Sequence, residues 1–357
     1  MPVERVSLER KATKMSTVHF FDPSIQLGHG AGGRASRRLI EGLVSPALGI
    51  WGPSELEDGA MLVVGDERLV MTTDSFVVSP RTFPGGSIGE LAVNGTLNDL
   101  AVSGAAPLAI SVALILEAGL ASEDLYRELE AIARCAGAAG VSVATGDTKV
   151  VEHGRGDGLF ITTTGVGRMH GKAALGAGRV RPGDAILLSG AIGDHGMTVM
   201  LARGELDLAS ESLRSDTRPV WPYVEALLDR FGPEVRWMRD PTRGGLATTL
   251  NELATSAKIK IVLDEGSIVV HDPVRGACEI LGIDPLHVAN EGQFVAVVSA
   301  EIASDAKALL RSLPGGDEAM VIGEVEAAEI PVVVAVSGYG GSRVIDMLTG
   351  DPLPRIC

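Results

Sequence analysis

The first strong pattern of apolar and polar positions begins near residue 61. Between residues 61 and 79, the apolar groups MLVVG, LVMTT and FVVS are separated by polar residues, which is typical of successive β-strands. Residues 88–103 then repeat apolar side chains at intervals of three and four, which predicts a helix. A buried strand is expected at 108–116, a helix that begins near Ser122, and further strands at 141–145 and 159–166.

A Gly-, Arg- and Pro-rich stretch at 171–183 interrupts this pattern, and AILLSG then begins a second series of strands and helices. We expect helices at 195–203, 220–231, 243–256 and 303–313, and strands at 260–263, 294–299 and 331–336. From Gly338 onward glycine and proline dominate, which predicts a tail and not a packed element.

The pattern indicates an α/β (α+β) protein of two domains. The expected divisions are a loose N-terminal extension at 1–27, an N-terminal domain at 28–172, a C-terminal α/β domain at 173–337 and a flexible tail at 338–357.

Composition narrows the classes of function. The chain has 46 acidic and 31 basic residues, a formal charge of −15, which disfavours binding to nucleic acids or anionic membranes. The charged N-terminal residues do not resemble a secretion signal, and the longest apolar run, 108–116, is too short to span a bilayer. Three cysteines without metal-like spacing fit a reduced, cytoplasmic setting.

The glycine-rich segment GHGAGG at 28–33 literally matches the dinucleotide-binding pattern G-x-G-x-x-G. That motif also requires a preceding strand and a following βαβ unit, whereas Pro23 interrupts the preceding residues. The NAD interpretation is therefore disfavoured. Two alternatives stay open: a plain turn, or a loop in which the amides of Gly30, Gly32 and Gly33 approach a phosphate.

Several acidic and amide side chains stand at predicted strand ends or beside a helix face, where they can converge on one crevice. They are Asp58, Asp74, Asn98, Asp99 and Asp147. Each can individually be a turn or cap residue, but together they are suited to Mg²⁺ and phosphate oxygens. Asp99 lies inside an apolar helical pattern, where a carboxylate needs a partner.

Three further residues are candidates for chemistry. Lys149 follows Asp147 by two positions and can be either a surface lysine or a functional one, and Glu291 can be an ordinary loop carboxylate. Cys357 is the last residue of the sequence, on a Gly- and Pro-rich segment, and a thiol so placed can act as a carrier arm. Prenylation is excluded because that signal needs three residues after the cysteine. Cys135 and Cys278 are interpreted as structural.

The segments GHGAGG, EDGAML, TTDSFVVSP, FPGGSIGELAVNGTLNDLAVSGAAP, ATGDTKVV, DPTRGGLATTLNE, ANEGQ and PRIC together resemble the HypE family of hydrogenase-maturation proteins. That family belongs to an ATP-using superfamily with aminoimidazole ribonucleotide synthetase, selenophosphate synthetase and thiamine-monophosphate kinase. The resemblance extends from Gly28 to Cys357.

This resemblance implies a homodimer formed mainly through the N-terminal domains, and an ATP-dependent reaction that uses Mg²⁺. A carbamoyltransferase, HypF, would attach a carbamoyl group to the sulfur of Cys357. Phosphorylation of the amide oxygen would then allow its loss and leave a thiocyanate. The iron-assembly proteins HypC and HypD would receive the cyano group for the metal centre of [NiFe]-hydrogenase.

The resemblance also implies roles for the candidate residues. Asp58, Asp74, Asn98, Asp99 and Asp147 match positions that bind ATP phosphates or Mg²⁺, with Asp58, Asp99 and Asp147 as metal ligands. Lys149 and Glu291 match residues near the thiocyanate, and Lys149 would act either as a base or as a stabilising charge.

Two alternatives remain from the sequence. One is another enzyme of the superfamily, such as a selenophosphate synthetase, although that enzyme would be expected to carry a reactive cysteine near the glycine loop. The first cysteine here is Cys135, within a predicted helix. The other alternative is a non-catalytic scaffold whose tail docks a partner.

Overall fold

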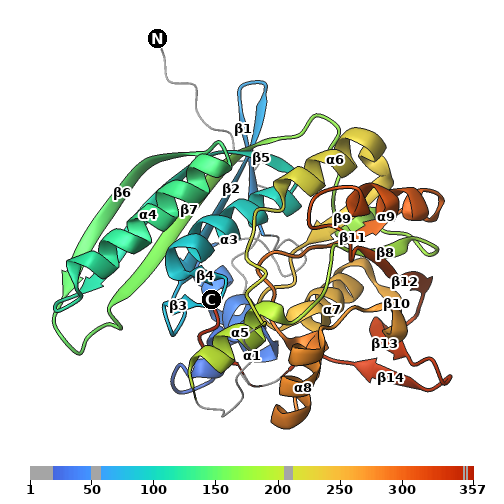
Figure 1. Cartoon of the computed structure of the whole chain (residues 1–357). Coiled ribbons are helices and arrows are strands. Elements are labelled where there is room, and N and C mark those ends of the chain that lie inside the picture. Colours follow the sequence, from blue (N-terminus) through green and yellow to red (C-terminus); the bar gives the residue numbers. More distant parts are fainter. Residues whose placement is uncertain (1–18, 50–57, 205–211, 349, 351–352) are drawn as a thin grey trace.

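The computed structural model describes residues 19–49, 58–204, 212–348, 350 and 353–357. Most of the expected loose extension, residues 1–18, lies outside the described residues. The described chain forms two large sheets, each with its own helices, and one small two-stranded sheet (Figure 1). No helix in the described part of the chain has the length and apolar character needed to cross a membrane.

The N-terminal sheet has five strands in the order β1-β2-β7-β5-β6. Strands β5 and β6 run parallel, and the other neighbours are antiparallel. The bounds are β1 Ala60–Val64, β2 Glu67–Phe76, β5 Ala105–Glu117, β6 Ser142–Val151 and β7 Leu159–Met169. A small hairpin, β3 Thr82–Phe83 with β4 Gly86–Ser87, precedes the first long helix.

Helices α3 (Ile88–Val102) and α4 (Ser122–Ala138) lie on one face of this sheet (Figure 1). The core forms because α3 is buried almost all round, and its Leu91 and Leu97 pack with Ile110 and Ile161 of the sheet. Ser122 is the first residue of α4, so the helix start expected near this residue is confirmed. On the opposite face, alternate residues of β7 are only partly buried.

The C-terminal sheet has seven strands in the order β14-β13-β10-β12-β8-β11-β9. The strand bounds are β8 Ala185–Leu188, β9 Val235–Arg239, β10 Ile259–Asp264, β11 Val295–Val298, β12 Met320–Ala327, β13 Val332–Val336 and β14 Ser342–Ile345. The helix bounds are α5 Asp194–Ala202, α6 Trp221–Phe231, α7 Gly245–Ala257, α8 Asp272–Leu281 and α9 Ala303–Arg311.

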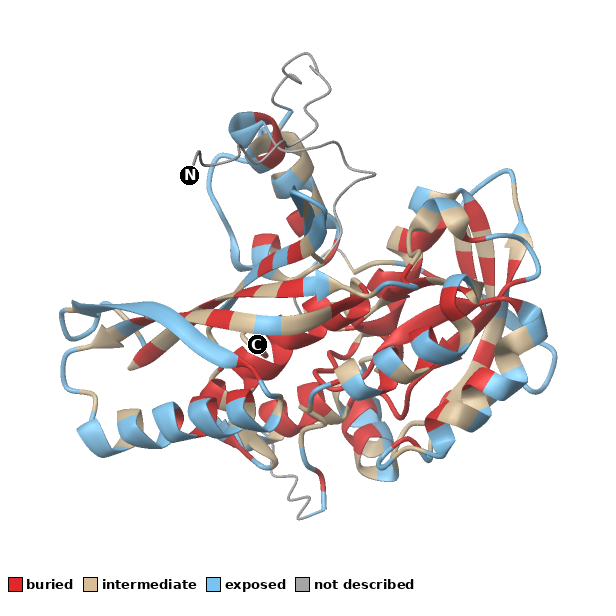
Figure 2. Ribbon diagram, turned by 90° about the horizontal axis from the view of Figure 1, so that it is seen from above, coloured by how far each residue is buried: buried red, intermediate tan, exposed pale blue. Residues whose placement is uncertain are grey.

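Both faces of this sheet are covered, as the apolar run of β8 requires. Ile186 and Leu188 face a cluster that includes α7, whereas Ala185 and Leu187 face a cluster that includes α6 and α9. Figure 2 shows buried residues gathered between the layers and exposed residues on the outer faces of the helices.

The expected flexible tail needs a correction. Residues 342–345 form β14, which pairs with β13, and the side chains of Leu353 and Ile356 are buried. The polar SRVI strand lacks apolar alternation because three of its four residues are exposed, so the sequence pattern did not reveal it. The last residues are therefore packed in this structure.

The N-terminal segment wraps back toward this tail. It contains short helices at η1 Leu27–Gly30, α1 Arg34–Leu39, η2 Ile40–Val44 and α2 Ser45–Leu48. The amide of Arg34 donates to the carbonyl oxygen of Leu348 at 3.1 Å. A side chain at Gly33 would collide with that carbonyl, and one at Gly32, where φ is 76°, would collide with Arg243. Glycine at these positions lets the loop approach both segments.

Candidate active site

The peptide at 353–357, called the tail peptide below, lies between the two domains and is held from both sides. On one side, the amide of Val77 donates to the main-chain oxygen of Cys357 at 3.1 Å. On the other, Leu353 and Ile356 are buried in an apolar cluster with residues of α5 and α8. This docking brings Cys357 inside the molecule, where its side chain is half-buried.

Arg203, the C-terminal cap of α5, joins the tail peptide to the N-terminal domain. Its Nε donates to the carbonyl oxygen of Ser79 at 2.8 Å, and its guanidinium also donates to the carbonyl oxygens of Pro354 and Arg355. The planar, multiply donating guanidinium is suited to several acceptors at once. One side chain therefore links α5, the tail peptide and the loop after β2.

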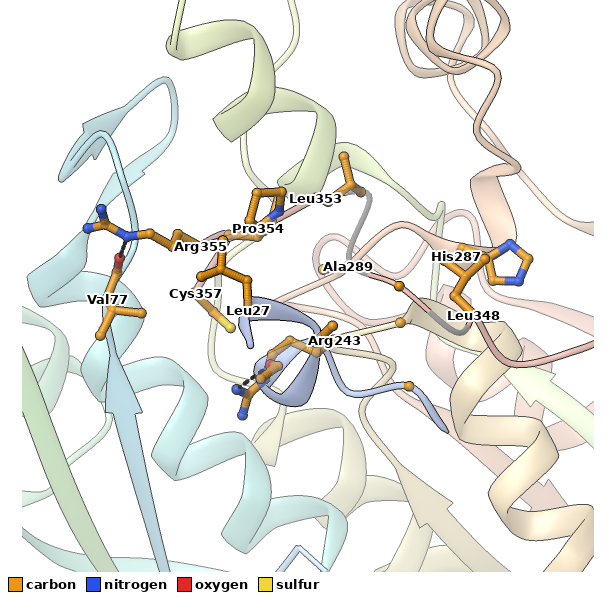
Figure 3. A pocket seen from close by; sticks show the side chains of 16 residues that line it. Leu27, Val77, Arg243, His287, Ala289, Leu348, Leu353, Pro354, Arg355 and Cys357 are labelled. Carbon is orange, nitrogen blue, oxygen red and sulfur yellow. Dashed lines mark hydrogen bonds between the residues drawn. The ribbon is translucent and has the colours of Figure 1, made fainter. Parts of the chain in front are cut away.

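A cavity of about 190 Å³ lies beside the tail peptide. The glycine loop, the residues before α7 and the tail peptide itself line it. Figure 3 shows the Cys357 sulfur on the side of the cavity toward Arg243. A guanidinium nitrogen of Arg243 donates to the carbonyl oxygen of Gly30 at 3.3 Å, which connects this arginine to the glycine loop.

The charge of Arg243 is matched by negative charges around it. The pKa of Arg243 is raised, and the largest cause is the negative charge at Cys357. Burial of the guanidinium lowers this pKa, whereas the charges of Asp74 and Glu291 raise it further. Arg243 therefore stays cationic next to the tail thiol. A cation in this position favours a thiolate and attracts a phosphoryl group.

Beneath this cavity three carboxylates from both domains converge. Oxygens of Asp58, Asp99 and Asp240 all lie within 4.8 Å of one another. The hydroxyl of Thr72 on β2 lies 2.8 Å from Asp99 Oδ2, and Arg239 pairs with Asp58 at 3.0 Å. Asp99 comes from α3 and Asp240 follows β9, so the cluster forms only where the two domains meet.

The pKa values of two of these carboxylates, Asp99 and Asp240, are raised. Burial is the largest cause for Asp99, followed by the charges of Asp240 and Asp58, and it holds the pKa well above its usual range. Burial and the charge of Asp58 raise the pKa of Asp240 to about 8. Asp74, on the same face of β2 as Thr72, also has a pKa raised first by burial, while Arg243 lowers it.

This donor set fits a divalent cation. Mg²⁺ prefers carboxylate oxygens and needs few protein ligands when phosphates and water complete its shell. A cation between the three carboxylates would relieve the repulsion that contributes to the raised pKa values of Asp99 and Asp240. Within one chain Asp240 takes the third position, in which the sequence had placed Asp147.

A second cavity, of about 480 Å³, opens beside the cluster. Gly30, Gly32, Asp58, Asp240 and Arg243 contribute to its lining, together with hydroxyl side chains of α7. Its volume is in the range of small-molecule sites. The glycine loop, the acidic cluster and Arg243 therefore lie around this second cavity.

Glu291 lies on the loop before β11 and is buried. Its Oε1 has no hydrogen-bond partner among the described residues. Burial first, and then the charges of Asp240, Asp74 and Asp216, hold its pKa well above the usual range, while Arg243 lowers it. A buried carboxyl group with one unused oxygen is suited to exchange a proton with a ligand.

Asn98 has a different place from the one expected. Its side chain is buried and ties two segments of the C-terminal domain together: Nδ2 donates to the carbonyl oxygen of Glu291 at 2.9 Å, and Oδ1 accepts from the amide of Val220 at 2.9 Å. In this structure it therefore orders the site and does not line either cavity.

Asp147 and Lys149 lie elsewhere. Both are exposed on β6, at the edge of the N-terminal sheet, and Lys149 Nζ pairs with Asp147 Oδ2 at 2.6 Å. Neither residue lines the cavity beside Cys357 or belongs to the cluster of Asp58, Asp99 and Asp240. Their assignment to the site remains a prediction.

Sequence reasoning missed four residues at the site: Asp240, Arg243, Arg203 and His195. Asp240 and Arg243 stand in DPTRGGLATT, directly before α7, and a charged pair next to two glycines was the available signal. No local signal marked Arg203 or His195, because their partners lie on the tail peptide, more than a hundred residues away.

Two family models match the chain. "AIR synthase related protein, N-terminal domain" matches residues 56–169, and "AIR synthase related protein, C-terminal domain" matches residues 181–336. The two-domain fold and the site between its halves therefore define a member of the AIR synthase related proteins.

Particular relatives narrow this class. The carbamoyl dehydratase HypE of Azotobacter vinelandii is 48% identical over 343 residues, which cover 96% of this chain and 100% of the relative. A chain in a crystal structure of a HypE–HypF complex is 41% identical, with a TM-score of 0.82, and covers 87% of this chain and 99% of its own length. The crystal structure of hydrogenase maturation protein HypE in complex with ATP is 42% identical, with a TM-score of 0.78 and coverage of 94% and 100%.

The chain belongs to the HypE carbamoyl dehydratase family, and it is an enzyme of that family. The family and the α/β fold class expected from the sequence are thereby confirmed.

Proposed function

We propose that this chain uses ATP to dehydrate an S-carbamoyl group on Cys357 to a thiocyanate, which supplies cyanide for the iron centre of [NiFe]-hydrogenase. One observation carries the proposal: the docked tail peptide places the Cys357 sulfur beside Arg243, at a cavity next to the acidic cluster. A substrate attached to that sulfur enters the site together with the tail. The relatives named carbamoyl dehydratase support the same reaction.

The reaction balances as S-carbamoyl-cysteine plus ATP giving S-cyano-cysteine, ADP, phosphate and a proton. The carbamoyl oxygen attacks the γ-phosphorus, and the bond from that phosphorus to the bridging oxygen of ADP breaks. Two protons leave the nitrogen, the carbon–oxygen bond breaks with phosphate as the leaving group, and a carbon–nitrogen triple bond forms. Phosphorylation is needed because an amide oxygen is otherwise a poor leaving group.

Arg243 and Glu291 take the two electrostatic tasks in this scheme. Arg243 faces the sulfur and stabilises negative charge on the transferring phosphoryl group. Glu291 accepts a proton from the nitrogen, because a buried carboxylate with a raised pKa is a stronger base than an exposed one.

Asp58, Asp99 and Asp240 would hold Mg²⁺, and Asp74 lies close enough to influence the same charges. The ion, when bound, supplies positive charge that neutralises the ATP phosphates. Gly30 and Gly32 line the second cavity, and Gly30 and Gly33 line the cavity beside the tail peptide, so this loop would lie next to the bound phosphates. The crystal structure of a HypE with ATP supports nucleotide binding here.

The proposed assembly is a homodimer that includes Asp147 and Lys149 from the neighbouring subunit. Among the strands of the described chain, β6 has a neighbour on one side only, and nine of its ten residues are exposed. An edge of this kind is prone to pair with another copy. Lys149 would then reach the thiocyanate of its partner as a base or a stabilising charge, and Asp147 the metal.

The proposed partners are the carbamoyltransferase HypF, which supplies the carbamoyl group, and the iron-assembly proteins HypC and HypD, which receive the cyano group. A crystal structure of a HypE–HypF complex supports the first of these. We place the reaction in the cytoplasm, where the described cysteines, which form no disulfide, would stay reduced.

A mass spectrum of the peptide containing Cys357 tests the function. Incubation with the carbamoyltransferase and its substrates should add a carbamoyl mass to Cys357, and ATP should convert it to a cyano adduct. Cys357→Ala should form neither adduct yet bind ATP, while Cys135→Ala serves as a control that forms both. ATP turnover on a carbamoyl donor that survived Cys357→Ala would contradict the mechanism.

A further inference from the structure

His195, in the first turn of α5, is fully buried and contacts the tail peptide directly. Its Nε2 lies 3.0 Å from the carbonyl oxygen of Ile356, the residue before Cys357. Its Nδ1 lies 2.8 Å from Ser215 Oγ, and the Phe83 ring packs nearly perpendicular to the imidazole with centroids 5.5 Å apart. The proposed reaction does not use this histidine.

The hydrogen-bond partners of the His195 ring determine which of its nitrogens carries the hydrogen. A carbonyl oxygen only accepts, so Nε2 carries the hydrogen and donates it to Ile356. Burial lowers the pKa of His195, and the neutral ring then accepts the Ser215 hydroxyl at Nδ1. One imidazole therefore bonds the tail peptide on one side and the segment 215–217 on the other.

The segment 215–217 in turn holds Glu291. The carboxylate of Asp216 accepts the amides of Glu291 and Gly292 at 3.0 and 3.2 Å. The amide of Ser215 donates to the carbonyl oxygen of Pro84 at 2.8 Å, which fixes the segment to the N-terminal domain. A continuous path thus runs from the tail carbonyl to the main chain of Glu291.

We propose that His195 is a positioning residue that couples docking of the tail peptide to the placement of Glu291, through Ser215 and Asp216. The coupling rests on the proposed function, because it assigns Glu291 to that reaction. When the tail leaves, the Nε2 hydrogen loses its acceptor, which favours a rearranged ring and releases Ser215. Glu291 is thereby placed for proton transfer only when the substrate-bearing tail is present.

Arg203 offers a matched contrast. It also holds the tail peptide, but its other partner is the carbonyl oxygen of Ser79, which does not contact Glu291 in the bonds described. Arg203→Gln should loosen docking without breaking the path from His195 to Glu291.

The test separates docking from chemistry with two measurements. Docking is measured as the rate at which a maleimide labels Cys357, located by peptide mass. Chemistry is measured as the single-turnover conversion of the S-carbamoylated chain to its cyano form after ATP is added. Thermal melting and ATP binding check that each variant is folded.

His195→Asn keeps an amide near Nδ1 but none near Nε2, whereas His195→Gln keeps one near Nε2. His195→Asn should speed labelling by about threefold to tenfold, the range expected for one lost hydrogen bond, and His195→Gln should label like the wild type. Ser215→Ala should label like the wild type but convert about threefold to tenfold more slowly, and Ser215→Thr, which retains the hydroxyl, should restore the rate.

Two results overturn the coupling: wild-type conversion by Ser215→Ala, or unchanged labelling in His195→Asn. The first result would leave His195 as a residue that only docks the tail peptide, and the second would leave it as a packing residue. If the wild-type chain itself forms no cyano adduct, the proposed function fails and the coupling fails with it. If the wild type forms the adduct and Ser215→Ala equals its rate, only the coupling fails.

Discussion

At the scale of single residues, the site is defined by charges that repel each other. Asp58, Asp99 and Asp240 approach closely, yet among the described residues only Asp58 has a direct ion pair, with Arg239. The two domains bring these carboxylates together although the unbound site favours a proton on Asp240. Carboxylates that repel each other in this way are typical of sites where a bound cation compensates their negative charge.

Replacing Asp240 tests this interpretation. Mg²⁺ at ten times its Kd should stabilise the wild-type chain by about 1.4 kcal/mol, and Asp240→Asn should lose most of that gain because one ligand charge is removed. Without Mg²⁺ the variant should be at least as stable as the wild type, since a repelling carboxylate is gone. Melting temperatures with and without Mg²⁺ measure both effects.

The exposed carboxylate Glu301 on η8 (Ala300–Ile302) supplies the control. Glu301→Gln should respond to Mg²⁺ like the wild type. An undiminished Mg²⁺ response in Asp240→Asn would remove Asp240 from the metal site.

The same residues show how much of the candidate site could be predicted from the sequence. Asp58, Asp99, Glu291 and Cys357 were singled out from local patterns and a family resemblance, and the structure places all four around the space between the domains. Asp240 was missed because its significance arises only from contact with residues far away in the chain. The Asp58–Arg239 pair beside it joins positions 181 residues apart, and no periodicity reports such a contact.

At the scale of elements, α5 is the support on which the tail peptide rests. His195 lies near its start and Arg203 caps its end, and both bond the tail. The first residue of α5, Asp194, accepts hydrogen bonds at 2.9 Å from His271, which caps α8. The second ring nitrogen of His271 lies 3.0 Å from Glu318.

The His271 contacts predict a dependence of stability on pH. Burial alone would lower the pKa of His271, but hydrogen bonds to Asp194 and Glu318 outweigh it and raise the pKa. Stabilisation by the protonated ring is therefore complete below the unfolded pKa of about 6.5 and is lost as pH rises through the higher folded pKa.

We expect the denaturation midpoint of the wild type in urea to exceed that of His271→Gln at pH 6, and the difference to shrink by pH 9. Comparison with the variant cancels the titration of other groups. A difference that stayed constant over this range would mean that the His271 charge does not stabilise the contact between α5 and α8.

Elements with a clear apolar period were predictable, and irregular ones were not. The pattern located α3, α5, α6, α7 and α9 to within two residues at both ends, because each buries one face or all of its surface. It missed β12, whose pairing with β8 is interrupted by a shift between Val321 and Gly323. A bulge of this kind breaks the alternation on which strand prediction depends.

At the scale of the whole molecule, a single chain brings only some of the predicted site residues together. Cys357, Arg243 and the acidic cluster lie together between the domains, whereas Asp147 and Lys149 stand on the exposed strand β6. Apolar side chains are also exposed on this sheet, including Val143 at 46% and Val150 at 67%. Pairing of two copies along this face would cover those side chains and bring Lys149 to the other subunit.

The dimer makes a prediction that a single-chain site does not. Cys357→Ala and Lys149→Ala should each be inactive in dehydration when prepared alone. In a heterodimer of the two, isolated with different affinity tags, one site combines the intact Cys357 of one subunit with the intact Lys149 of the other. That site should convert its carbamoyl group, which gives about half of the wild-type yield per dimer because one of two equivalent sites is restored.

The control is a chain that carries both substitutions, paired with the wild type. In that heterodimer one subunit supplies Cys357 but receives no Lys149, and the other receives Lys149 but has no Cys357, so a site shared between subunits yields no product. If Lys149 acted within its own chain, the outcomes would be exchanged: the first heterodimer would be inactive and the control about half active. The two heterodimers contain the same number of altered residues, so only their arrangement between subunits decides the result.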